Sequence, residues 1–123
     1  MWAVATTDEF DEWFGDLEEA GQVEVAAKVK LLGVLGPELR RPHADTLKGS
    51  KYPNMKELRA DTKDAVLRIA FAFDPTRSAI LLCGGNKAGV SQKRFYTTFI
   101  QRADRLYGMH LDKRNVKKNL EET

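Results

Sequence analysis

The sequence predicts an α+β domain in which an N-terminal strand and a helical hairpin are followed by an antiparallel meander and a C-terminal helix. Apolar residues recur with helical spacing in residues 8–35 and again after Ser91. Between residues 55 and 83 they follow the pattern of strands, with turn-forming residues between the runs. Helices and strands therefore come in separate blocks, which is typical of an α+β domain, and 123 residues are enough for one such domain.

The chain begins with a predicted strand and a predicted amphipathic helix. Residues 2–6 (WAVAT) favour an edge strand, which we expect to pair in the same sheet as the later strands and make it four-stranded. Thr7 is the expected N-cap of a helix over 8–19, because acidic residues follow it in the first turn. Apolar residues at helical spacing give this helix one buried face: Phe10, Trp13, Phe14 and Leu17.

A second helix and a long loop follow. Gly21 is expected to break the first helix, and the second helix is predicted over 22–35 because Gly36-Pro37 stops it. Residues 37–54 hold three of the four prolines, which predicts a loop. Long loops in small domains are often functional, and this one interleaves Tyr52 with basic residues that suit a nucleic-acid backbone: Arg40, Arg41, His43, Lys48 and Lys51.

Three strands are predicted next, over 55–60, 65–73 and 78–83. The short turns between them favour an antiparallel meander. The middle strand has one large apolar face, made of Leu67, Ile69, Phe71 and Phe73. Residues 84–89 (GGNKAG) are expected to leave the sheet, because their glycines suit a turn.

Ser91 is the expected cap of the last helix, whose apolar face should pack on the sheet. Residues 112–123 are charged and lack an apolar face, so we expect a flexible tail that follows a single domain over 1–111.

Charge is distributed unevenly along the chain. Residues 1–27 hold eight acids and no base, whereas the rest of the chain holds all 20 bases. Such asymmetry indicates an anionic partner for the basic part, although two solvated faces would produce the same pattern.

Cysteine and histidine are too few for a metal site or an internal disulfide. Cys83 stands alone, and His43 and His110 are far apart in the sequence. We therefore expect no metal and no cofactor. The lone cysteine and the lack of a signal-like or membrane-spanning stretch favour a cytoplasmic protein.

Arg68 is the most informative cation, because strand alternation places it between Val66 and Ala70. A charge among apolar neighbours is costly unless it has a partner. Two interpretations remain open: Arg68 binds a phosphate, or it forms an ion pair with Glu57 or another acid.

A set of cations with an aromatic neighbour can support RNA cleavage. Attack by a 2′-hydroxyl on its own phosphodiester needs charge stabilisation, a proton acceptor and a proton donor, and it does not need a metal. The candidate groups are Lys56, Arg59, Arg68, Lys87, Arg94 and Tyr96.

Several short motifs follow one another in a characteristic order: RPHADTLKGS at 41–50, NMKELR at 54–59, LRIAFAFDP at 67–75, ILLCGGNKAG at 80–89, KRFY at 93–96 and ADRLYGMHL at 103–111. Their order and spacing resemble the RelE/ParE toxin superfamily, in its HigB-type, phage-related branch.

This resemblance implies a RelE-like fold and the toxin of a type II toxin–antitoxin pair that cleaves mRNA on the ribosome without metal. It also implies a helix-turn-helix antitoxin as partner, with operator DNA bound only through that antitoxin, and no membrane. The implied catalytic residues are Arg68, Lys87, Arg59 and Lys56. The implied RNA-binding residues are Arg94 and Lys93, with either Tyr96 or Phe95 as the aromatic that stacks on a base. No histidine or acid stands where the family's nucleases often carry one, so the general acid and base stay unassigned.

Two alternatives belong to other functional classes. One is a ParE-type toxin that acts on DNA gyrase without nuclease activity, which would not need cations on the strands. The other is a non-toxic module that binds RNA or protein.

Overall fold

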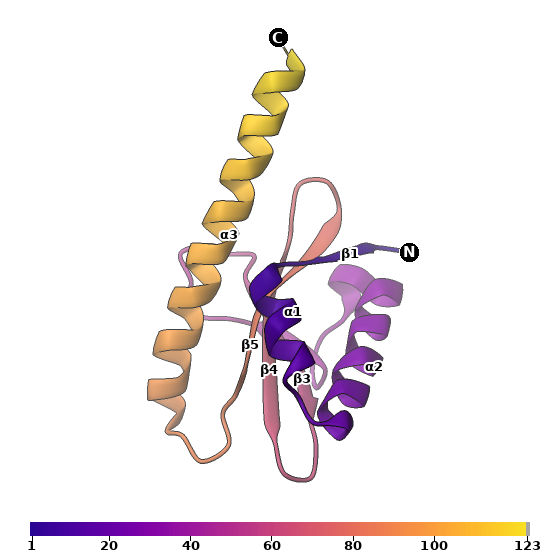
Figure 1. Ribbon diagram of the computed structural model, residues 1–123, viewed down its shortest axis with the longest axis vertical. Helices are drawn as coiled ribbons and strands as arrows, with labels where there is room; N and C mark the ends of the chain where they lie inside the picture. The colour runs from indigo at the N-terminus through magenta and orange to yellow at the C-terminus, as the bar shows by residue number, and fades with distance from the viewer. Residues whose placement is uncertain (123) are drawn as a thin grey trace.

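The computed structural model describes residues 1–122 and confirms the predicted α+β class (Figure 1). Its elements follow the chain as β1 (Ala3–Thr6), α1 (Asp8–Gly15), α2 (Glu19–Leu35), a 3-10 helix (Gly36–Glu38), β2 (Ala44–Thr46), β3 (Lys56–Asp61), β4 (Val66–Phe73), β5 (Ser78–Asn86) and α3 (Gln92–Glu122). None of the helices within residues 1–122 is both long and apolar enough to cross a membrane.

The sheet has five strands in the order β1-β5-β4-β3-β2. The predicted meander of β3, β4 and β5 is antiparallel, and β1 joins its edge in parallel with β5. The expectation of four strands was wrong, because residues 44–46 of the predicted loop form β2 on β3. The pairing of Ala44 with Leu58 buries both residues, which stabilises a strand too short to be seen in the local sequence pattern.

The helical hairpin covers one face of the sheet. Phe10 of α1 and Leu32 of α2 are buried with Leu58, Ile69 and Phe71 of the strands. The joint lies earlier than predicted, since α1 ends at Gly15 and α2 begins at Glu19. Gly21 is buried inside α2 instead of breaking the helix, and a Cβ there would lie 3.4 Å from Leu67, so its small size serves packing.

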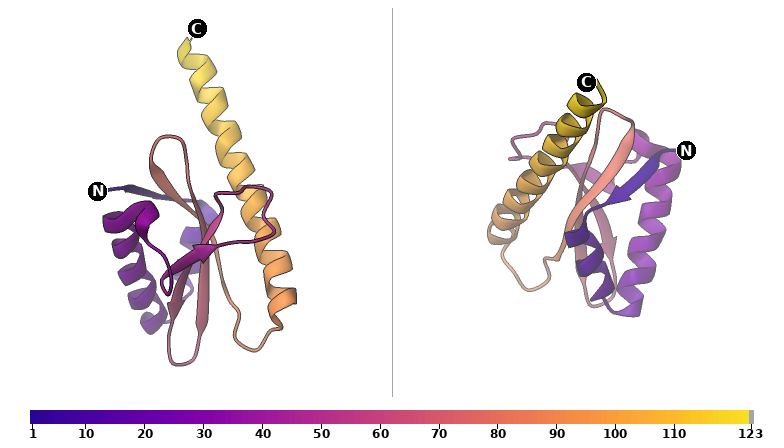
Figure 2. Two further views of the ribbon diagram at one scale, coloured as in Figure 1. Left: turned by 180° about the vertical axis from the view of Figure 1, so that it is seen from behind. Right: turned by 45° about the horizontal axis from the view of Figure 1, so that its top comes forward.

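The opposite face of the sheet is covered by α3 (Figure 2). Ser91 caps this helix as predicted, because its hydroxyl oxygen accepts a hydrogen bond from the backbone N–H of Arg94 at 3.3 Å. Residues 112–122 continue the helix, and residue 123 lies outside the described residues. The flexibility expected of 112–123, and the domain boundary at 111, stay predictions.

Gly84 and Gly85 remain in β5, so the expected exit from the sheet at this point was wrong. The glycines allow aromatic rings to lie directly against the strand. A Cβ on Gly84 would overlap the ring of Trp13 from α1, and a Cβ on Gly85 would lie 2.9 Å from the ring of Phe95 from α3. The two glycines therefore admit one helix on each face of the sheet.

Candidate functional site

A shallow pocket of about 360 Å³ lies on the α3 face of the sheet, and we call it the β3–α3 groove. Its walls come from the segment around β2, from β3, from the turn after β5 and from the start of α3. The lining residues are Arg41, Asp45, Thr46, Leu47, Lys48, Glu57, Arg59, Lys87, Gln92 and Tyr96. Segments far apart in the sequence thus bring three predicted site residues together, namely Arg59, Lys87 and Tyr96.

Glu57 contacts two other lining residues of the groove, although its side chain is almost completely buried. Only 3% of the residue is exposed. Its Oε2 accepts hydrogen bonds from Nε and Nη2 of Arg59, at 3.1 and 3.0 Å, and its Oε1 accepts one from the hydroxyl of Tyr96 at 2.7 Å. Bonds of this charge-assisted kind are about twice as strong as neutral ones, so Glu57 fixes both partners in place.

Arg68 lies behind Glu57 and does not line the groove itself. It is directly opposite Arg59 across the β3–β4 ladder, and it is 6% exposed. Its Nη1 donates to Asp61 Oδ1 at 2.6 Å and to its own strand at the carbonyl of Leu67. Its Nε lies 3.9 Å from Glu57 Oε1 and has no hydrogen-bond partner within the described residues. The ion-pair interpretation of Arg68 therefore holds in the free chain, and it puts a second guanidinium beside the groove carboxylate.

Asp45 contacts two arginines that line the groove, Arg41 and Arg59. Its Oδ2 accepts a hydrogen bond from Arg41 at 2.9 Å and lies 3.4 Å from Nη2 of Arg59. The Arg41 hydrogen bond, helped by the backbone N–H of Thr46, holds the pKa of Asp45 below its usual value. Asp45 is consequently ionised at neutral pH and forms ion pairs with both arginines.

Tyr96 and Lys87 form the α3 side of the groove. The Lys87 ammonium lies 5.4 Å from the centre of the Tyr96 ring, within the range of a cation–π contact. Burial and the hydrogen bond to Glu57 raise the pKa of Tyr96 to about 12. The phenol therefore keeps its proton at neutral pH and acts as a donor toward Glu57.

The other predicted site residues lie elsewhere. Strand alternation places Lys56 on the sheet face of the helical hairpin, with Leu58 and away from Glu57. Phe95 is buried and stacks on Phe99 with ring centroids 5.0 Å apart, so its ring belongs to the core under α3. Lys93 and Arg94 are exposed in the first turn of α3 and do not line the groove.

Glu57 was missed as a site residue, because the sequence indicated only that it could pair with Arg68. The signal was present in the strand period, which places Glu57 and Arg59 on one face of β3. Glu57 is itself buried in the strand, and a buried acid has to be paired, so Arg59 and Arg68 on that face are the available partners.

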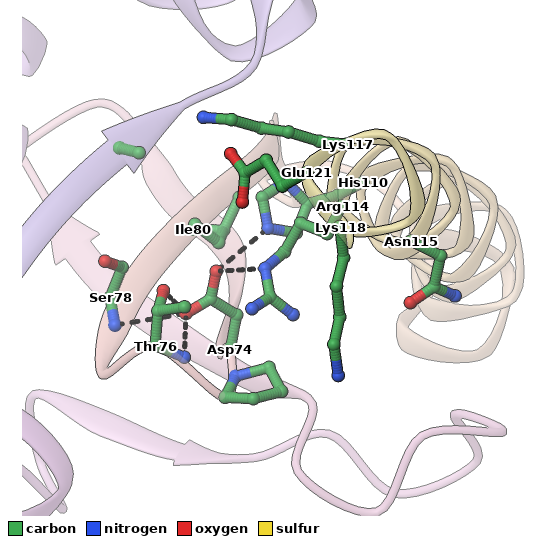
Figure 3. A pocket seen from close by; sticks show the side chains of 12 residues that line it. Asp74, Thr76, Ser78, Ile80, His110, Arg114, Asn115, Lys117, Lys118 and Glu121 are labelled. Atoms are coloured by element: carbon green, nitrogen blue, oxygen red, sulfur yellow. Dashed lines mark hydrogen bonds and ion pairs between the residues drawn. The ribbon is translucent and has the colours of Figure 1, made fainter. Parts of the chain in front are cut away.

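A larger pocket of about 690 Å³ lies near the other end of α3, beside the β4–β5 turn (Figure 3). Figure 3 shows His110 and Arg114 of α3 pointing at Asp74, which accepts from His110 Nε2 at 3.0 Å and lies 3.6 Å from Arg114 Nε. We call these three residues the Asp74 clamp. Within residues 1–122 no group of three or more His, Cys, Asp or Glu side chains is arranged to hold a metal ion.

The chain is similar to known proteins in sequence and in fold. Residues 12–108 match the family model described as phage-derived protein Gp49-like (DUF891). Two chains of Mycobacterium tuberculosis bear the names of candidate toxins. HigB2 is 39% identical over 109 residues, which are 88% of this chain and 54% of HigB2. HigB3 is 45% identical over 103 residues, which are 83% of this chain and 87% of HigB3.

The chain thus spans about half the length of HigB2 and most of HigB3. Among solved structures it resembles the Escherichia coli toxin RelE, in a free double arginine-to-alanine variant, with a TM-score of 0.59 and 8% identity over 82% of this chain and 95% of that one. The likeness to RelE shows the fold. The chain therefore belongs to the Gp49-like family of phage-derived proteins, as a HigB-type member with a RelE-like fold.

Proposed function

We propose that the protein is the toxin of a type II toxin–antitoxin pair and that it cleaves mRNA on the ribosome without a metal ion. The observation that carries the proposal is the buried carboxylate of Glu57, held by Arg59 and Tyr96 inside a groove that also contains Lys87. A carboxylate, a phenol and cations within one groove are the groups that cleavage through a 2′-hydroxyl requires.

Tyr96 and Glu57 together accept the proton of the 2′-hydroxyl. The substrate's 2′-hydroxyl gives its proton to the Tyr96 oxygen while Tyr96 passes its own proton to Glu57 Oε1. Tyrosinate never accumulates in this relay, which agrees with a Tyr96 pKa of about 12. The 2′ oxygen attacks phosphorus, the bond from phosphorus to the 5′ oxygen breaks, and Lys87 gives a proton to that oxygen. The products are a 2′,3′-cyclic phosphate and a 5′-hydroxyl.

Arg59 and Arg68, which face each other across the β3–β4 ladder, stabilise the negative charge of the transition state. Arg59 lines the groove and can reach a phosphate directly, whereas Arg68 acts from behind Glu57. A planar guanidinium can contact two oxygens of the phosphorane-like transition state at once. Arg41 and Lys48 at the outer edge are placed to hold the flanking backbone.

Dependence on the ribosome is consistent with the charge balance of the free groove. Asp45 is paired with Arg41, Glu57 with Arg59, and Asp61 with Arg68. These carboxylates weaken the attraction for free RNA, because each of the three arginines has an intramolecular partner. A message held in position by the ribosome would not need that attraction.

The HigB-type relationship supports an antitoxin as partner, and we expect a helix-turn-helix protein encoded beside this chain. Operator DNA would be bound through the antitoxin.

Controlled induction in a bacterial host tests the function. Primer extension should reveal cuts in a translated message and none in the same message without its start codon. Intact translated messages in growth-arrested cells would contradict the proposal, and inhibition of supercoiling by purified DNA gyrase would then favour the ParE-type alternative.

A further inference from the structure

The outer face of α2 is exposed and largely apolar. Val23 is 62% exposed, Val34 and Leu35 are exposed as well, and Ala26, Ala27 and Lys30 are exposed between them. The inner face of the same helix is also apolar, with Val25 and Leu32 fully buried. Exposed apolar side chains that recur along one face of a helix give that face the character of a contact surface.

The last turns of α3 carry a second exposed apolar stripe. The helix extends past the end of the sheet (Figure 1), and we call residues 109–121 the α3 arm. Met109, Val116 and Leu120 are exposed on it, and Val116 is 60% exposed. The Asp74 clamp holds the base of the arm to the β4–β5 turn (Figure 3), so the arm has a defined direction relative to the sheet.

The two stripes match in length, and the hairpin and the arm differ in net charge. The α2 stripe runs from Val23 to Val34 and the arm stripe from Met109 to Leu120, so each spans a length of about 16 Å at the helical rise. The hairpin over residues 8–35 holds eight acids and two lysines, and the two acids within α2 are Glu19 and Glu24, near its N-terminal end. The arm holds four bases and two acids, with Lys113 and Lys117 beside Val116.

We propose that a second copy of this chain is the partner for both stripes, with the α3 arm of each copy lying along α2 of the other. A two-fold axis makes the exchange reciprocal and closes the pair, because each copy offers the same arm and the same hairpin. Apolar contact along the helices provides attraction, and opposite charge at the margins sets the register.

The β3–α3 groove stays open in such a pair. Tyr96 and Val116 are far apart along α3, on the order of 30 Å by the helical rise, and the arm lies at the end of α3 away from the groove. Pairing is therefore independent of the proposed nuclease chemistry, and the two can fail separately.

Sedimentation velocity of the full chain tests the proposal. In low salt we expect monomer and dimer in exchange, with the dimer fraction rising with protein concentration. Val23→Asp and Val116→Asp should each weaken the dimer by at least about tenfold, because each buries a charge in one stripe. Val90→Asp is the matched control, since Val90 is 44% exposed and lies on neither stripe.

Charge exchange identifies the partner as a second copy. Lys113→Glu with Lys117→Glu should weaken the dimer, and adding Glu19→Lys with Glu24→Lys to the same chain should restore it. Far-ultraviolet circular dichroism should show unchanged helix content in all variants.

A monomer at every concentration would overturn the proposal. A dimer that neither valine variant weakens would also overturn it. The proposal would also be overturned if the chain were monomeric and its valine variants no longer bound a co-expressed antitoxin. That result would assign the two stripes to the antitoxin.

Discussion

The hydroxyl of Tyr96 donates a hydrogen bond of 2.7 Å to Oε1 of Glu57, which joins the first turns of α3 to the start of β3. The same carboxylate holds Arg59 on its other oxygen. One buried acid therefore sets the positions of a phenol and a guanidinium that come from different elements. The site is intact only when the sheet and α3 are packed together.

Tyr96→Phe removes the hydroxyl and leaves the ring. We expect cleavage to fall by about 100-fold, because the proton relay to Glu57 is lost. Stability should fall by about 1.5–3 kcal/mol, the range for a hydrogen bond to a charged group. The measurement is message cleavage alongside urea unfolding. Tyr107→Phe is the control, since its hydroxyl contacts the carbonyl of Phe73 away from the groove, and it should keep full activity.

Arg68→Ala tests the guanidinium behind Glu57. Growth inhibition should be abolished, and the free energy of unfolding should fall by about 1–3 kcal/mol, because the hydrogen bonds to Asp61 and the Leu67 carbonyl are lost. Arg68→Lys keeps the charge and should retain partial activity. Growth assays on soluble, folded variants are the measurement. Full toxicity of a folded Arg68→Ala chain would remove Arg68 from the site.

Gly84→Ala tests the close approach of α1 to β5. Its new methyl group would overlap the Trp13 ring, so we expect a loss of about 1–3 kcal/mol, the usual cost of overpacking. Gly15→Ala is the control, because a Cβ there has no neighbour within 4 Å and should be tolerated. Urea unfolding of both variants measures the difference. Equal stabilities would mean that Trp13 can move aside without cost.

Asp74→Asn tests the Asp74 clamp through its dependence on pH. Burial acts to raise the pKa of Asp74, but hydrogen bonds from Thr76, His110 and Ser78 outweigh it and lower the pKa below 3.8. A depressed folded pKa gives stability that is present above the unfolded value of 3.8 and is lost as pH falls through the lower folded value.

The melting temperature of wild type should therefore be higher than that of Asp74→Asn at neutral pH. The difference between the two should decrease as the pH falls below 3.8. Thermal melts over this series provide the measurement. A gap that stays constant in acid would show that ionised Asp74 is not what stabilises the clamp.

Local periodicity was enough to predict most of the elements. The alternation in residues 65–73 predicted the two faces of β4, and the structure buries one under the hairpin and the other under α3. The failures share a cause, because each feature depends on contacts distant in sequence. β2 exists through its pairing with β3, Gly21 is buried against Leu67, and Gly84 stays in its strand under Trp13.

The candidate site was only partly predictable for the same reason. Side-chain type correctly selected Arg59, Lys87 and Tyr96 as neighbours of one groove. Lys56 was chosen for its charge, although its place in the strand period already put it on the other face. The sequence did not show whether Phe95 or Tyr96 faces the site, because that depends on how α3 is oriented on the sheet. Glu57 was missed because its role depends on contacts with Arg59 and Tyr96 that only the fold creates.

A reconstituted cleavage reaction tests the central claim most directly. Purified ribosomes holding a defined message are mixed with wild type, Glu57→Gln or the exposed control Glu38→Gln, and the ends of the cleaved RNA are mapped. Wild type and Glu38→Gln should produce 2′,3′-cyclic phosphate ends only when ribosomes are present, and folded Glu57→Gln should be slower by about 100-fold or more. Cleavage by Glu57→Gln at the wild-type rate, or no cleavage by wild type on ribosomes, would contradict the account.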